Sequence, residues 1–286
     1  MNDTIQADQL MGKSHRVPTG LGQLHVVEIG TGSEAIVLWP SIFTDHHIYD
    51  ELARRLSDRF RFLLIDGTGH GQSEGLVKGF TMLQCAQAIE TVMDVFGLEA
   101  AIVGGTSWGG LAAAELALVS PARVKAVVLM NTPMEIDERS PKFSARMIAA
   151  GARWMLGTSA FRKGVAKSFF SDTALLANPG YAQHFHDMLR SVEAAPLAAA
   201  VRSVLLRGKP LKARLNVLSM PVLVIAGKAD AMYPIENQAH AASLAPNGRF
   251  EPVNGKHISV LEEPTAVAEI LRDFAREVLV SMSLRR

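Results

Sequence analysis

Short apolar runs alternate along this chain with segments in which apolar residues recur every three or four positions. Continuous apolar runs of four to eight residues are typical of strands buried on both faces of a parallel sheet. The segments expected to form strands are 35–39, 62–66, 101–104, 124–130, 221–225 and 249–253. This alternation predicts an α/β fold, with a mostly parallel sheet flanked by helices on both faces.

Helix boundaries can be assigned from local signals. A helix is expected from about Asp45, because Ile48, Leu52 and Leu56 share one face. Another is expected to begin after Thr81, a favourable N-cap, and to end at Gly97, a favourable residue after a helix. Further helices are expected at 110–119 and from 265 to about 280, and Cys85 is interpreted as a core residue of the second helix.

The strand pattern stops after 131–133 for about eighty residues and resumes at 221. The intervening stretch is helical in pattern, and no linker rich in proline or glycine separates it from its flanks. This predicts one core domain, 1–133 and 214–286, with a helical cap inserted at 134–213.

Composition excludes several classes of partner. The 286 residues carry a formal charge of +1, which favours neither nucleic acid nor an anionic membrane surface. The single cysteine excludes an internal disulfide. No apolar run is long enough to span a bilayer, and no basic and apolar leader is visible. We therefore expect a cytoplasmic location and no membrane partner, and the sequence is compatible with a homo-oligomer.

A Gly-x-Ser-x-Gly motif, 105–109, lies between a predicted strand and a predicted helix. In that context the serine occupies a sharp turn, and the small neighbours allow the strand and the helix to approach each other. The turn raises the hydroxyl of Ser107 above the edge of the sheet, next to a helix N-terminus that favours negative charge. Ser107 is thus a candidate nucleophile.

A serine nucleophile needs a base and an orienting carboxylate. Asp230 follows the predicted strand at 221–225, and His257 follows the one at 249–253, so both are expected at the same sheet edge as Ser107. Three other acids follow the strand at 124–130 and remain alternatives to Asp230. They are Glu135, Asp137 and Glu138.

These motifs together resemble the α/β-hydrolase superfamily, over about 22–280. The resemblance rests on the stretch at 66–73, the serine motif, the stretch at 227–230, and His257 followed by 261–264. Within the superfamily the chain is most similar to 3-oxoadipate enol-lactonases and related small-ester hydrolases. This implies the α/β-hydrolase fold, a small-molecule ester or lactone substrate and a structural loop at His70. The histidines show no metal-ligand spacing and no phosphate loop is present, so neither a metal nor a cofactor is expected.

The sequence departs from these families at the end of the strand at 35–39. They usually have His-Gly there, or Ser-Asn in the enol-lactonases, whereas this chain has Trp39 and Pro40. Because proline has no N–H, the resemblance assigns the oxyanion donors to the backbone N–H groups of Ser41 and Trp108. A bulky Trp39 beside the entrance indicates a different or larger substrate.

The substrate pocket is expected between the cap and the core, with apolar character. Candidate lining residues are Trp39, Ile42, Trp154, Met155, Met232 and Ile258. Four cap arginines are candidates for pairing with a substrate carboxylate, although most of them are expected to be solvated charges on helix faces. They are Arg146, Arg153, Arg162 and Arg190.

The motifs favour hydrolysis of a carboxylic ester or lactone through an acyl-enzyme. The same three side chains could instead cleave a carbon–carbon bond of a diketone, or the scaffold could serve as a non-catalytic ligand receptor. Haloalkane dehalogenation is disfavoured, because that chemistry uses an aspartate where Ser107 stands.

Overall fold

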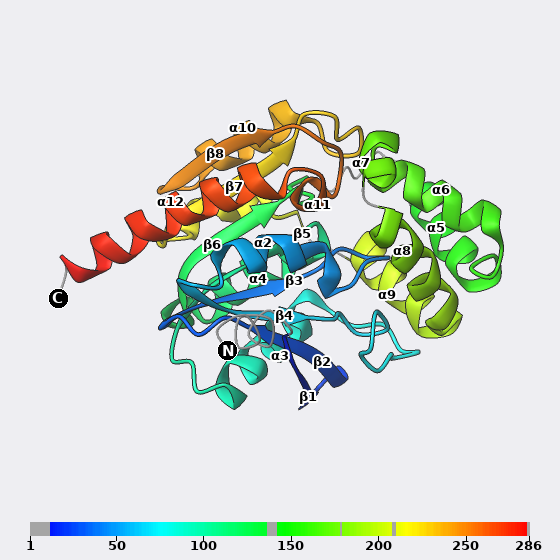
Figure 1. Cartoon of the computed structure of the whole chain (residues 1–286), viewed down its shortest axis with the longest axis horizontal. Helices are drawn as coiled ribbons and strands as arrows, with labels where there is room; N and C mark the ends of the chain where they lie inside the picture. The colour runs from blue at the N-terminus through cyan, green and yellow to red at the C-terminus, as the bar shows by residue number, and fades with distance from the viewer. Residues whose placement is uncertain (1–11, 136–141, 178, 208–209, 285–286) are drawn as a thin grey trace, which may run out of the picture.

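A twisted sheet of eight strands crosses the computed structural model, which describes residues 12–135, 142–177, 179–207 and 210–284 (Figure 1). The strands lie in the order β1-β2-β4-β3-β5-β6-β7-β8. Their bounds are β1 Lys13–Thr19, β2 Gly22–Ile29, β3 Glu34–Trp39, β4 Phe60–Ile65, β5 Ala101–Thr106, β6 Val124–Met130, β7 Val222–Gly227 and β8 Gly248–Val253. Every strand expected from the apolar runs is present.

Six strands, β4-β3-β5-β6-β7-β8, run parallel, and β2 joins them antiparallel to β4. The register places Met130 of β6 beside Thr106 of β5 and Ile225 of β7. The residues that follow β5, β6 and β7 therefore emerge at one edge of the sheet, where open α/β folds bind their ligands.

Helices cover both faces of the sheet. Figure 1 shows α2 (Asp50–Leu56) and α12 (Pro264–Ser283) in front of the sheet, with α3 (Met82–Val95) and α4 (Trp108–Val119) behind it. The α10 helix (Ile235–Leu244) packs on β7 and β8. Among the described helices, none combines the length and the apolar character that crossing a bilayer requires.

The N-terminal signals identified in the sequence operate as expected in α3. The Thr81 side chain accepts a hydrogen bond from the Gln84 N–H, and the Gln84 side chain accepts one from the Thr81 N–H, which together make a capping box. Cys85 faces inward on this helix and is buried, so its prediction as a core residue is confirmed. The segment from Asp45 differs slightly from expectation. It begins as a 3-10 turn, η1 (His46–Tyr49), before α2.

In the described part of the segment between β6 and β7, five α-helices gather beyond the carboxyl ends of the strands (Figure 1). They occupy the segment for which the sequence predicts a cap. Their bounds are α5 Lys142–Trp154, α6 Ser159–Phe169, α7 Asp172–Ala177, α8 Pro179–Ser191 and α9 Ala194–Arg207. The remaining short elements are η2 Pro121–Arg123, η3 Lys212–Val217 and α11 Ser259–Glu262.

Candidate active site

The turn between β5 and α4 holds Ser107 in a strained conformation. Its φ of 55° and ψ of −108° lie in a region where residues other than glycine are rarely found. A Cβ atom at Gly109 would clash with the carbonyl oxygen of Trp39, so only glycine lets α4 pass this close to β3. The Ser107 N–H is tied to the Met130 carbonyl oxygen at 2.8 Å. This hydrogen bond to the end of β6 thus stabilises the strained conformation of Ser107, which is the N-cap residue of α4.

His257 and Asp230 form a buried pair at the same sheet edge. Nδ1 of His257 lies 2.9 Å from Oδ2 of Asp230, and both side chains are almost completely buried. An ionised carboxylate only accepts hydrogen bonds, so Nδ1 carries the proton and Nε2 is the basic nitrogen of the neutral ring. Neither Nε2 of His257 nor the Ser107 hydroxyl makes a hydrogen bond with any described residue.

Asp230 is kept in its charged form. Burial alone would raise the pKa of Asp230, but hydrogen bonds from His257, Asn131 and the N–H of Met232 outweigh it and hold the pKa below its ordinary value. The other oxygen, Oδ1, also accepts from the N–H of Tyr233 at 3.3 Å. The four donors restrain the carboxylate from both sides, so it presents a fixed face to His257.

Asn131, the first residue after β6, donates a hydrogen bond to the carboxylate of Asp230. Its Nδ2 donates to Oδ2 of Asp230 at 2.9 Å and to the carbonyl oxygen of Lys256 at 3.2 Å. Its Oδ1 accepts from the hydroxyl of Ser259 at 2.5 Å. The side chain therefore joins the loop of Asp230 to the loop of His257, and its backbone adopts a φ of 47° to do so.

The alternative acids are placed differently. Glu135 is partly exposed and pairs with the ammonium group of Lys212. Asp137 and Glu138 lie outside the described residues. Among the described acids, Asp230 alone is hydrogen-bonded to His257.

The two backbone groups assigned as oxyanion donors are both free within the described part of the chain. Trp108 is the first residue of α4, so its N–H has no partner inside the helix. The N–H of Ser41 is likewise without a hydrogen bond. Ser41 and Thr44 are joined in a turn, because both the N–H and the hydroxyl of Thr44 donate to the Ser41 carbonyl oxygen.

His70 fixes the same loop from the core side. Its Nε2 accepts a hydrogen bond from the N–H of Phe43 at 2.9 Å, and its Nδ1 donates to the carbonyl oxygen of Thr68 at 3.1 Å. Phe43 has a φ of 62°, so the imidazole stabilises a conformation that phenylalanine rarely adopts. The structural role that the resemblance implies for His70 thus acts on the loop of Ser41.

A family model described as the alpha/beta hydrolase fold matches residues 34–264. The chain belongs to the α/β hydrolase fold family. The matched segment runs from β3 to the start of α12 and includes Ser107, Asp230 and His257.

Individual relatives of this α/β hydrolase are distant but span most of its length. It is 27% identical over 244 residues to 3-oxoadipate enol-lactonase 1 of Acinetobacter baylyi, covering 85% of this chain and 89% of that protein. The enol-lactonase structure from Burkholderia xenovorans LB400 superposes with a TM-score of 0.84 and 25% identity, covering 92% of this chain and all of the other. A thermophilic esterase from Thermogutta terrifontis has the same fold, with a TM-score of 0.83 at 22% identity over 93% of this chain and 99% of that one.

In this α/β hydrolase the side chain of Trp39 does not lie where the sequence predicts it. Its side chain is fully buried and meets the Trp108 ring edge-on, with centroids 5.1 Å apart. The pair packs against Gly67, where a Cβ atom would meet the Trp108 ring at 2.6 Å. The prediction that Trp39 lies beside the entrance is wrong, because the ring completes the core beneath the serine turn.

The other pocket candidates divide into two groups. Ile42 and Ile258 are buried next to Ser41 and His257, and Met232 is partly exposed two residues after Asp230. Trp154 and Met155 are 76% and 48% exposed at the end of α5, and the guanidinium of Arg153 covers the Trp154 ring. Side chains this exposed line no enclosed pocket, so the prediction for these two residues is corrected. An amphipathic pattern does not reveal which apolar residues a cap helix leaves outside.

Two aromatic rings that are not among the pocket candidates lie beside His257. The ring of Phe169, at the end of α6, lies 5.1 Å from the imidazole, and the ring of Tyr233 lies 5.4 Å away. Phe43 is 6.1 Å from Phe169 and from Phe161. The imidazole therefore has one ring of the cap and one ring of the core as apolar neighbours.

The four cap arginines do not converge on this ring cluster. Arg162 donates to the carbonyl oxygen of Leu156, Arg190 pairs with Asp187, and Arg153 covers Trp154. Arg146 is exposed on α5. Three of the four are thus engaged by other parts of the cap.

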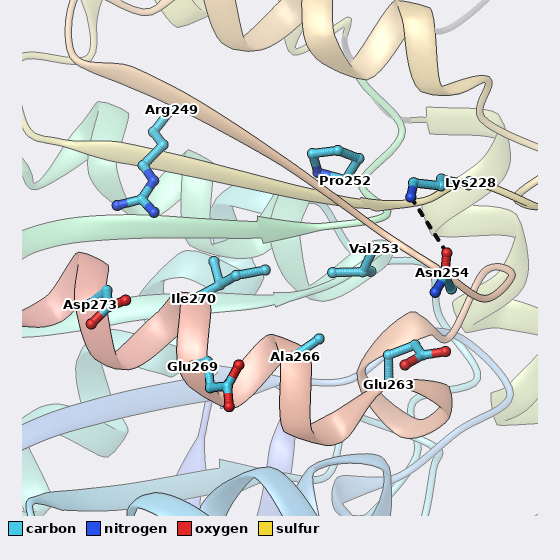
Figure 2. Close-up of a pocket in the computed structure, with 10 residues that line it drawn as sticks. All are labelled: Lys228, Arg249, Pro252, Val253, Asn254, Glu263, Ala266, Glu269, Ile270 and Asp273. Atoms are coloured by element: carbon cyan, nitrogen blue, oxygen red, sulfur yellow. Dashed lines mark hydrogen bonds between the residues drawn. The ribbon is translucent and has the colours of Figure 1, made fainter.

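A separate pocket of 390 Å³ lies between β8 and α12 (Figure 2). It contains none of the triad candidates, and its two cations, Lys228 and Arg249, already have polar partners. Its lining residues are Lys228, Arg249, Pro252, Val253, Asn254, Glu263, Ala266, Glu269, Ile270 and Asp273.

Proposed function

We propose that this α/β hydrolase cleaves carboxylic esters or lactones with Ser107 as nucleophile, His257 as general base and Asp230 as the orienting acid. The observation that carries the proposal is the buried His257–Asp230 hydrogen bond of 2.9 Å, at the sheet edge from which the strained Ser107 turn emerges. The enol-lactonase relatives support the same class of reaction.

In the proposed reaction, Nε2 of His257 takes the proton of Ser107 as the oxygen attacks the carbonyl carbon. Asp230 holds the imidazole in the required tautomer and stabilises the imidazolium. The N–H groups of Ser41 and Trp108 receive the negative charge that develops on the carbonyl oxygen. The imidazolium then protonates the leaving alcohol, and water releases the acyl group with His257 again as base.

The surroundings of His257 favour an uncharged substrate. The rings of Phe43, Phe169 and Tyr233 offer apolar contact, whereas a substrate carboxylate would need a cation or a set of N–H donors. Three of the cap arginines are already engaged elsewhere. We therefore propose an ester or lactone with an apolar or aromatic acyl group, in preference to an acidic enol-lactone.

The test of the nucleophile combines covalent labelling with hydrolysis of an aryl ester. A fluorophosphonate probe should label the wild-type chain and leave Ser107→Ala unlabelled, and the variant should lose on the order of a millionfold in kcat. Ser243→Ala is the matched control, because Ser243 is an exposed serine on α10 whose hydroxyl, among the described residues, bonds only to the His240 carbonyl oxygen. Labelling of Ser107→Ala, or activity of a few per cent, would refute the assignment.

The substrate class is tested on the wild-type chain with three compounds. These are an aryl ester, an acidic enol-lactone and a diketone. We expect the highest kcat/KM for the ester. A diketone cleaved faster than the ester would replace ester hydrolysis by carbon–carbon bond hydrolysis, and faster turnover of the acidic lactone would refute the apolar pocket.

A further inference from the structure

Groups of imidazole and carboxylate side chains include residues that follow β3 and β4, and two of these groups share no residue. In the first, Asp66 accepts from His25 at 2.8 Å and from His46 at 2.7 Å. Asp66 also accepts from the N–H of Gln72, and Nε2 of His25 is bonded to the Ser14 hydroxyl. This group is buried, and its carboxylate accepts hydrogen bonds on both oxygens, so we assign it to the stability of the fold.

The second group joins the cap to the core. Nε2 of His184, on α8 of the cap, lies 2.7 Å from Oδ2 of Asp45, in the loop after β3. The ring of His47 is 4.2 Å from the ring of His184. One ligand atom from each of these three residues lies within 4.8 Å of the others. Asp45 is buried, whereas the side chains of His47 and His184 are about one-third exposed and open to solvent.

We propose that Asp45, His47 and His184 form a binding site for a divalent transition-metal ion such as Zn²⁺, which would tie α8 of the cap to the core. Two imidazoles and one carboxylate are a ligand set that zinc prefers in proteins. The site lies outside the triad, and the proposal does not depend on the proposed function.

A fourth side chain has the place of an outer-shell partner. Oδ2 of Asp50 accepts a hydrogen bond from Nδ1 of His47 at 2.6 Å, which leaves Nε2 of that ring without a partner among the described residues. Metal-bound histidines usually donate their second ring N–H to a carboxylate in this way, which fixes the tautomer and the orientation of the ring. Asp50 would perform that function here.

The local charge also favours a cation. The carboxylates of Asp45 and Asp50 both lie against these imidazoles, Asp45 at 2.7 Å from Nε2 of His184 and Asp50 at 2.6 Å from Nδ1 of His47. A divalent ion would experience the negative potential of these two carboxylates.

Only small movements are needed to bind the ion. Metal–ligand bonds of about 2.0–2.1 Å in a tetrahedral site place ligand atoms roughly 3.3 Å apart. The atoms within 4.8 Å would move together, and the His184–Asp45 contact of 2.7 Å would open slightly. When the metal takes the place of the proton between His184 and Asp45, that proton leaves to solvent from an imidazolium, whereas in a neutral ring the proton moves to Nδ1, so that a neutral imidazole binds the metal through Nε2.

The site adjoins the loop of the proposed oxyanion donor. Asp45 directly follows Thr44, which is bonded to the Ser41 carbonyl oxygen. A metal on His184 would therefore hold the cap helix α8 against the segment that presents the Ser41 N–H. Binding at this site is expected to rigidify the contact between cap and core.

The experiment measures Co²⁺ and Zn²⁺ binding to the untagged full chain after treatment with a chelator. We expect one Co²⁺ per chain, with visible absorption bands of a nitrogen- and oxygen-ligated ion, and displacement by Zn²⁺. His184→Gln should weaken binding more than roughly 100-fold, beyond the usual cost of losing an outer-shell partner, and Asp50→Asn should weaken it about 10- to 100-fold. His186→Gln, two residues further along α8, should bind as the wild type does.

Two results would overturn the proposal. One is a wild-type chain that binds no stoichiometric Co²⁺ or Zn²⁺, which would make the group a hydrogen-bond network only. The other is a folded His184→Gln variant that binds as tightly as His186→Gln. If His184→Gln does not fold, His47→Gln removes another, partly exposed ligand and must show the same loss.

Discussion

Acid should destabilise this fold through one buried imidazole, His70. Its Nδ1 donates to the Thr68 carbonyl oxygen and its Nε2 accepts from the Phe43 N–H, so both nitrogens are used by the neutral ring. Burial lowers the pKa of His70 from 6.5 to about 4, in spite of the Thr68 carbonyl and the charge of Asp66. A proton on Nε2 would face the N–H of Phe43 and break the contact that holds the loop of Ser41.

The direction and size follow from proton linkage. The unfolded chain takes up this proton near pH 6.5, but the folded chain takes it up only near pH 4, so the unfolded state binds more protons between these values. Stability is fully present above pH 6.5 and is lost as the pH falls toward 4. At about 1.4 kcal/mol for each pH unit between the two pKa values, the full loss is about 3 kcal/mol, of which about 2 kcal/mol is reached at pH 5.0.

Urea unfolding at pH 7.5 and pH 5.0 measures this loss when the wild type is compared with His70→Gln. The glutamine amide can accept from the Phe43 N–H and donate to the Thr68 carbonyl, but it does not titrate. All other titrating groups are common to both proteins and cancel. The wild type should lose about 2 kcal/mol more than the variant between the two pH values. Equal losses in the two proteins would show that His70 is not the group that takes up the proton.

Two further changes test the surroundings of His257. Asn131→Ala should lower kcat about tenfold with little change in KM, and should raise the pKa of Asp230 toward its ordinary value, because one hydrogen bond to the carboxylate is lost. Ser259→Ala leaves that amide in place and should cost less, so equal pH–rate profiles for the two variants would argue against a positioning role for Asn131. Phe169→Ala should raise KM for aryl esters more than it lowers kcat, because the ring packs beside His257; an unchanged KM would remove Phe169 from the pocket.

The parts of the structure that were predictable from the sequence depend on local signals. Apolar runs predict the buried strands, the Thr81 cap predicts the start of α3, and the serine motif between a strand and a helix predicts the turn at Ser107. In parallel strands, the carboxyl ends share one edge, so Asp230 and His257 could be expected near each other before any coordinates were known.

The remaining features depend on contacts between distant segments. Trp39 ends β3, where the sequence predicts an entrance residue, but its ring packs against the Trp108 ring in the space left by the missing side chain of Gly67. His184 and Asp45 are 139 positions apart, so no ligand spacing along the chain could indicate the proposed metal site. The role of Asn131 arises only from the register that places the end of β6 between β5 and β7.

Hydrogen bonds connect the cap to both proposed catalytic loops, the loop of His257 and the loop of Ser41. Near His257, the Ile258 N–H donates to the Phe169 carbonyl oxygen, and the hydroxyl of Ser171, after α6, donates to Glu262 at 2.6 Å. Near Ser41, the corresponding contact is the pair of His184 and Asp45. The two contacts come from different cap helices, so a rigid displacement of the cap would disturb the base and the oxyanion donor together. In the proposed enzyme, a rearrangement within the cap would therefore break fewer of these hydrogen bonds during substrate entry than a rigid displacement of the whole cap.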